Sequence, residues 1–175
     1  MSFRLPDPPH VPGSGTVPDR ALLEPLKAPC PALVRDDNWR DAYPFRAGLE
    51  LYAGGCFWEA HEVWEPVWLA TPPNSRERQL LAGLIQLANA GLKLRMRQSV
   101  AARRLVDLAA GHIAEASAGD RRPLMGVGLA DLQAGIVRWR AAIDDQPGQA
   151  GLNCCLLARP RIVIATLEGK VGHLR

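Results

Sequence analysis

The chain has 175 residues, a length at which one domain with a sizeable buried core is expected. Its net charge of +3 is too small for a dedicated nucleic-acid binder, so we expect no nucleic-acid partner. No apolar signal-peptide region opens the sequence, no apolar run reaches membrane-spanning length, and the four cysteines lack CxxC spacing, so we expect a cytoplasmic protein without a membrane partner.

Residues 1–38 are predicted to form a Pro-rich N-terminal extension. Eight prolines fall within the first 31 residues, which is too many for a regular helix or a central strand. Only Ala21–Leu26 could form a short turn of helix. The segment is therefore either a weakly ordered extension that adds little to the core, or an arm that wraps its own domain or a partner subunit.

Residues 39–145 are predicted to form a compact multi-helix bundle, which places the fold in the all-α class. The bundle is built on an antiparallel helical hairpin over residues 41–69. Asp41 can cap the first helix of this hairpin, and Gly54-Gly55 should end that helix with a left-handed residue. Pro66 should kink or end the second helix near its C-terminal end.

Three further helices are predicted from the spacing of apolar residues. Residues 76–97, capped by Ser75, carry an apolar arc that approaches half the circumference, so this helix should lie at the centre of the bundle. Residues 99–118 form an amphipathic helix, and a last helix covers about 129–144. Residues 146–175 are expected to be a C-terminal extension that packs on the bundle in an extended conformation.

The second helix of the hairpin carries the side chains with the most chemistry. At about 100° per residue, one narrow arc of it holds Phe57, His61, Trp64 and Trp68. Glu65 lies about 40° from His61, one turn further along. Glu59 and Glu62 rotate toward the opposite side. The helix is therefore expected to carry an aromatic stripe with a His/Glu pair at its margin.

A metal or catalytic site is one interpretation of this helix. His61 and Glu65, at positions i and i+4, can both reach one ion, as the two histidines of an HExxH motif do. Two ligands are too few for a catalytic zinc site, so a third must come from Glu62 or His112. On this interpretation Glu62 is the candidate catalytic residue, and a divalent metal is the candidate cofactor.

A buried polar network is the second interpretation. His61 beside Glu65 could be satisfied by Gln86, Asn89 or Lys93 of the central helix. A buried polar group without a partner costs about 1–3 kcal/mol, so such networks tend to be complete.

An interaction surface is the third interpretation. Trp58 and Leu69 project away from the aromatic stripe, and an exposed tryptophan is a common anchor in protein contacts. Residues 56–70 contain three acidic residues and no base, whereas residues 76–105 contain seven bases and one acid. The two segments could meet across a two-fold axis, which predicts a homodimer.

Three stretches of the sequence resemble those of a known family. They are Phe57-Trp58-Glu59-Ala60-His61-Glu62-Val63-Trp64-Glu65 followed by Trp68, then Leu84–Ala88, and then Ala101–Leu105. The first resembles the signature of the domain-of-unknown-function 309 family, and the other two look like that family's second and third helices. Lys93 stands where a histidine is expected in many members. The resemblance covers about residues 41–117 and implies a small all-helical bundle with no established activity.

These observations together predict an uncharacterised helical-bundle protein whose HExxE helix forms a buried polar network or an interaction surface. The alternative is a metal-binding protein or a metal-dependent hydrolase that uses the His/Glu pair.

Overall fold

The computed structural model describes residues 3–120, 122–145 and 149–164. Within these residues the chain forms seven α-helices and a short 3-10 turn, and the only β-type pairing consists of isolated bridges. The elements are α1 (Arg20–Lys27), η1 (Trp39–Asp41), α2 (Tyr43–Ala53), α3 (Phe57–Ala70), α4 (Arg76–Arg95), α5 (Ser99–Ser117), α6 (Leu129–Asp145) and α7 (Gln149–Leu157). The all-α class predicted from the sequence is confirmed.

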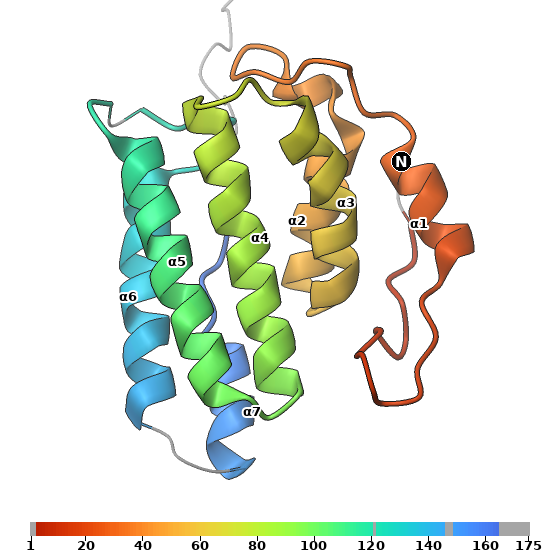
Figure 1. Ribbon diagram of the computed structural model, residues 1–175, viewed down its shortest axis with the longest axis vertical. Helices are drawn as coiled ribbons and strands as arrows, with labels where there is room; N and C mark the ends of the chain where they lie inside the picture. The colour runs from red at the N-terminus through yellow and green to blue at the C-terminus, as the bar shows by residue number, and fades with distance from the viewer. Residues whose placement is uncertain (1–2, 121, 146–148, 165–175) are drawn as a thin grey trace, which may run out of the picture.

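The helices are arranged around α4, which lies between α3 and α5 (Figure 1). Helix α2 pairs with α3 in the predicted hairpin, and α6 packs on α5. Helix α1 lies outside α3, and α7 contacts both α4 and α6 at one end of the bundle (Figure 1). The wide apolar arc of α4 explains its central position, because ten of its residues are buried.

The hairpin differs from the prediction at its start and agrees with it at its turn. Asp41 was expected to cap α2, but it lies in η1, and the capping position belongs to Ala42, whose side chain cannot accept a hydrogen bond. Gly55 adopts a φ of +78°, the left-handed conformation that the Gly54-Gly55 pair predicted. Helix α3 continues through Pro66 and ends at Ala70.

Glycines allow the hairpin and the central helix to pack closely. A Cβ atom on Gly48 of α2 would lie 2.3 Å from Nε1 of Trp64, and one on Gly91 of α4 would lie 2.6 Å from the Phe57 ring. The Trp64 indole fills the space beside α2 and donates a hydrogen bond to the carbonyl of Phe45 at 3.1 Å. The two large rings of α3 therefore fit only because their neighbours lack a side chain.

The N-terminal segment packs on the bundle as an arm. Helix α1 is capped by Asp19, whose side chain accepts a hydrogen bond from the backbone N–H of Leu22. Leu23, Leu26 and Val34 are buried in the core. The prediction of a weakly ordered extension that adds little to the core is therefore wrong, and the alternative of an arm that wraps its own domain describes the structure (Figure 1).

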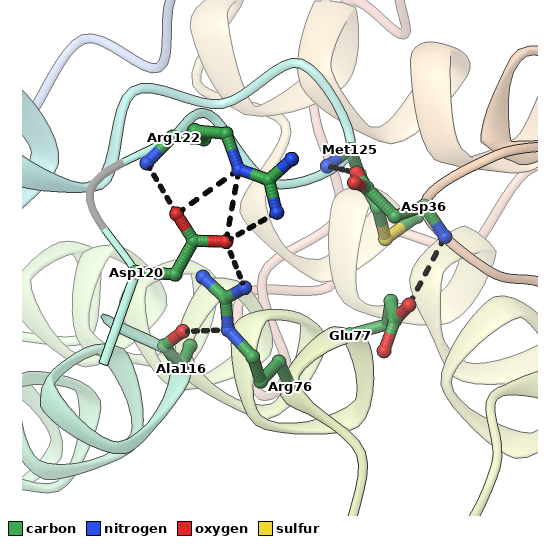
Figure 2. Close-up of polar contacts among 7 residues, drawn as sticks. All are labelled: Asp36, Arg76, Glu77, Ala116, Asp120, Arg122 and Met125. Carbon is green, nitrogen blue, oxygen red and sulfur yellow. Dashed lines mark hydrogen bonds and ion pairs between the residues drawn. The ribbon is translucent and has the colours of Figure 1, made fainter. Parts of the chain in front are cut away.

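Near the end of this arm, Asp36 forms hydrogen bonds with two segments that are distant in the sequence (Figure 2). The backbone N–H of Asp36 donates to the carboxylate of Glu77 at the start of α4. The carboxylate of Asp36 accepts from the backbone N–H of Met125, in the connection between α5 and α6. A single residue thus links the arm, α4 and the α5–α6 connection.

A second polar cluster, around Asp120, joins the start of α4 to the end of α5 and to the connection that follows α5 (Figure 2). Arg76 donates to the Asp120 carboxylate at 2.9 Å and to the carbonyl of Ala116 at 2.7 Å. Arg122 also donates to Asp120 at 2.9 Å. Hydrogen bonds from Arg122, and to a smaller extent from Arg76, hold the pKa of the Asp120 carboxyl well below its usual range.

The C-terminal extension is helical in part, which corrects the prediction of an extended segment. Helix α7 covers Gln149–Leu157, and its Cys155 carbonyl accepts a hydrogen bond from the buried indole of Trp139 at 2.6 Å. After α7 the chain is extended, and Ile164 forms an isolated antiparallel bridge with Val127. Residues 146–148 and 165–175 of the predicted extension lie outside the described residues. In the part of the chain that is described, no helix has the length and apolar character needed to cross a membrane.

Candidate functional site

Helix α3 is held on three sides, by α1, α2 and α4. The turn at Gly55 starts it directly after α2, and Glu59 places a negative charge in its first turn, where the helix dipole favours it. Its buried residues include Ala60, Val63 and Val67, all fully enclosed. This packing fixes the direction in which the polar residues of the HExxE sequence point.

The aromatic residues of α3 belong mostly to the core. Phe57 and Trp64 are buried, as the predicted stripe requires. Trp68 is partly buried, and the guanidinium of Arg78 lies 4.0 Å from the centre of its ring. Trp58 was expected to project away from the stripe as an exposed anchor, but it is half-covered, with the ring of His10 packed edge-on at 4.7 Å.

The central contact of the candidate site joins His61 to Asn89 of α4. The two side chains meet at 2.7 Å, between Nδ1 of the imidazole and Oδ1 of the amide. An amide oxygen only accepts, so Nδ1 carries the proton. In the neutral ring the lone pair is then on Nε2, which has no hydrogen-bond partner among the described residues.

His61, Glu62 and Glu65 form the one group of potential metal ligands found among the described residues. One ligand atom from each residue lies within 4.8 Å of the other two. His61 and Glu62 are half-buried, whereas Glu65 is exposed. Glu62 was predicted to rotate away from His61, but its flexible side chain brings a carboxylate oxygen back to the group. His112, the other candidate for a third ligand, instead bonds to Gln79 at 2.7 Å.

Glu62 is also paired with a cation from the N-terminal arm. Nζ of Lys27, at the end of α1, lies 2.8 Å from the Glu62 carboxylate. The two side chains retain only 23% and 27% of their exposure, so the pair is largely shielded from solvent. Residues 35 positions apart in the sequence make this contact, and no local pattern predicts it.

Gln86 and Lys93 do not join His61 in a network. The side-chain oxygen of Gln86 is buried and has no hydrogen-bond partner among the described residues. Lys93 is half-buried, and no hydrogen bond or ion pair of its side chain is found in the described part of the chain. Of the three predicted partners, Asn89 alone is therefore brought to His61.

Glu59 is the polar residue whose environment the helical projection missed. It was predicted to face away from the stripe, yet it is 1% exposed. One carboxylate oxygen accepts the backbone N–H of His10 at 2.7 Å, and the other is buried without a partner in the described residues. Because His10 lies 49 residues away, the only signal in the sequence was the presence of Glu59 in the HExxE helix itself.

Cys56 lies beside Glu59 and is not an activated nucleophile. Burial and, to a smaller extent, the Glu59 carboxylate raise the pKa of the Cys56 thiol to about 11, although Arg95 opposes both effects. A thiol that stays protonated at neutral pH does not supply the thiolate that nucleophilic catalysis needs. The chemistry of α3 therefore rests on His61 and its carboxylates.

Comparison with known proteins finds a family model that matches part of the chain. The model of the family described as Domain of unknown function (DUF309) matches residues 45–105, from within α2 to within α5. No curated protein and no solved structure matches the chain. The matched span contains the whole of α3 and α4, and therefore His61 with its neighbouring carboxylates and Asn89, whereas Lys27 and His10 of the arm lie outside it. Over residues 45–105, about a third of its length, the chain is therefore similar to the domain-of-unknown-function 309 family.

Proposed function

We propose that the protein binds a divalent transition-metal ion through His61, Glu62 and Glu65. The observation that carries this proposal is the convergence of the three ligand atoms within 4.8 Å of one another. Imidazole nitrogen and carboxylate oxygen together suit zinc, iron and manganese better than they suit magnesium or calcium, which prefer oxygen ligands alone.

The hydrogen bond from His61 to Asn89 supports the proposal. Histidines that bind metals almost always donate their other ring N–H to a neighbouring acceptor, which fixes the tautomer and the ring orientation. Asn89 accepts from Nδ1 at 2.7 Å and so leaves Nε2 as the ligand atom. In this role Asn89 is a positioning residue that does not touch the metal.

Metal binding should weaken the ion pair of Lys27 with Glu62, because the metal and the ammonium group are two cations at one carboxylate and repel each other. The ion pair is largely shielded but lies at the edge of the protein, where a single pair stabilises by about 1 kcal/mol or less. A divalent ion held by three ligands can offset this loss. Three protein ligands also leave positions for water, as in metal sites that perform hydrolysis.

A structural role is the second candidate function of the same residues. Here the hydrogen bond between His61 and Asn89 joins α3 to α4, and the pair of Lys27 and Glu62 joins α1 to α3. No metal is needed, and the carboxylate of Glu65, which is exposed, has no part in the network.

Glu65→Gln separates the two candidates. Zinc or manganese should raise the melting temperature of the wild-type protein. The gain in the free energy of unfolding should be about 2.7 kcal/mol when free metal is a hundredfold above its Kd. This gain should shrink between about pH 7.5 and about pH 5.5, because protons compete for the ligands. Glu65→Gln should abolish the gain and leave the metal-free stability nearly unchanged, since Glu65 is exposed.

Glu115→Gln is the matched control, because Glu115 is also exposed but lies on α5. This variant should keep the full response to metal. Calorimetric scans with and without metal give the comparison. A wild-type protein that does not respond to metal, together with a loss of about 1–3 kcal/mol in His61→Ala, would support the structural role instead.

A further inference from the structure

The molecule has a second site-like feature, a cavity of about 460 Å³ between α2 and the segment that follows α7. Leu49 and Tyr52 of α2 line one side, and residues 159–163 line the other. The walls are mostly apolar, and no acidic residue is among those that line the cavity. Its size falls within the roughly 300–1,000 Å³ typical of sites for small molecules.

Arg159 provides a positive charge in this wall. Its guanidinium donates to the backbone carbonyls of Ala53 and Leu156, which hold the side chain in place. Carbonyl oxygens carry no net charge, and no carboxylate pairs with Arg159 among the described residues. A guanidinium has five N–H donors, so three remain for another acceptor.

A second arginine lies close to the first across the ring of Phe57. A neighbouring cavity of about 390 Å³ shares Leu157 and Arg159 with the larger one, and Arg95 lines it. The guanidinium carbons of Arg95 and Arg159 lie 5.4 Å and 5.7 Å from the centre of the Phe57 ring. Neither guanidinium forms an ion pair with a carboxylate among the described residues, so the two charges concentrate positive potential where the cavities meet.

The hydroxyl of Tyr52 is a buried polar group without a partner. Tyr52 is 2% exposed, it lines the larger cavity, and its oxygen finds no hydrogen bond among the described residues. Burial raises the pKa of this hydroxyl strongly, and the charge of Arg159 opposes the rise, so the two groups are electrostatic neighbours. A buried hydroxyl without a partner costs about 1–3 kcal/mol, which a bound acceptor would relieve.

We propose that this cavity binds a small carboxylate with an apolar body. The carboxylate accepts hydrogen bonds from Arg159, and the apolar body lies against Leu49 and Val163. The planar fork of a guanidinium matches a carboxylate, and the apolar walls leave no polar partners for a heavily hydroxylated ligand. This site shares no lining residue with the His61 group and is independent of the proposed metal function.

Isothermal titration of the full chain with octanoate, 1-octanol and acetate tests the proposal. Octanoate should bind at least tenfold more tightly than 1-octanol, which lacks the charge, and than acetate, which lacks the apolar body. Arg159→Gln should weaken octanoate binding at least tenfold. Arg104→Gln, at an exposed position on α5 that lines none of these cavities, should leave octanoate binding unchanged.

Val163→Trp gives a second test that does not disturb the hydrogen bonds of Arg159. Val163 lines the cavity but is 69% exposed, so a larger ring there should fill the space without unfolding the chain. This variant should lose octanoate binding. Equal affinities for octanoate and 1-octanol, absence of octanoate binding to the wild type, or full binding by Val163→Trp would overturn the proposal.

Discussion

The environment of single residues decides how closely the helices approach one another. Gly91 of α4 and Gly111 of α5 are both helical glycines, and both cost helix propensity. A Cβ on Gly91 would lie 2.6 Å from the Phe57 ring, whereas a Cβ on Gly111 would meet no atom within 4 Å. The same substitution should therefore have opposite effects at the two positions.

Gly91→Ala should destabilise the protein by about 1–3 kcal/mol, because the new methyl group overpacks the contact between α3 and α4. Gly111→Ala should stabilise it by about 0.5–1 kcal/mol, because the helix gains propensity and loses no contact. Urea unfolding of both variants measures the two changes. A stabilised Gly91→Ala would show that Phe57 can move away at little cost.

The contribution of Asp120 to stability should depend on pH. Its pKa lies below its ordinary value of 3.8, so the ionised carboxylate is favoured in the folded state. The stability that it contributes is fully present above the unfolded pKa and is lost as pH falls through the lower folded pKa. The difference in unfolding free energy between the wild type and Asp120→Asn should therefore be constant above about pH 5 and shrink below about pH 4.

Urea unfolding across this pH range, with Asp37→Asn as an exposed control, measures the difference. Asp37 serves as the control because it is exposed and no hydrogen bond or ion pair of its side chain is found among the described residues. A constant difference between Asp120→Asn and the wild type at every pH would contradict the proposed role of the Arg122 and Arg76 bonds.

At the scale of elements, the N-terminal arm contributes to the buried core in a way that the sequence did not predict. Its prolines report local conformation only, and they do not show which surface the chain will meet. Leu23 is 2% exposed in the core beneath α1. Leu23→Ala should therefore destabilise the protein by about 2–5 kcal/mol, as expected for a buried leucine.

Val17→Ala, at a position of the same arm that is 85% exposed, should change stability by no more than about 0.5 kcal/mol. Thermal unfolding of the two variants makes the comparison. An unchanged Leu23→Ala would restore the earlier prediction of an extension that adds little to the core.

Apolar periodicity was enough to predict the helices of the bundle, because α2 to α6 each bury one face. Their boundaries also came within a few residues, and the Ser75 cap was correct, since its side chain accepts the N–H of Arg78. Helix α7 was missed because Pro147-Gly148 and Gly151 interrupt the sequence and Cys154-Cys155-Leu156-Leu157 shows no helical alternation of apolar and polar residues. Its position depends instead on contacts with α4 and α6.

The candidate site was predictable where its contacts lie within or between the periodic helices of the bundle. Positions i and i+4 on one helix placed Glu65 near His61, and the polar face of α4 suggested Asn89 as a partner. The pairing of Lys27 with Glu62 and that of His10 with Glu59 span 35 and 49 residues. Such contacts depend on how the arm folds back, which the spacing of residues does not report.

At the scale of the whole molecule, the homodimer remains a prediction. It rested on the opposite charges of residues 56–70 and 76–105. Part of that charge is paired within the chain, by Lys27 with Glu62 and by Arg103 with Asp144. Sedimentation equilibrium at moderate salt should give twice the chain mass of 19.0 kDa. A single species of 19.0 kDa at high protein concentration would contradict it.

The pairing of Lys27 with Glu62 has a thermodynamic consequence for the proposed metal site. Lys27 and the proposed metal are two cations at one carboxylate, so the folding of α1, which brings Lys27 to Glu62, opposes metal binding. Thermodynamic linkage makes this effect reciprocal. Any change that stabilises the packing of α1 on α3 lowers the affinity for the metal, and metal binding destabilises the packing of α1 by the same factor. The N-terminal arm would then sense the occupancy of the site that it covers.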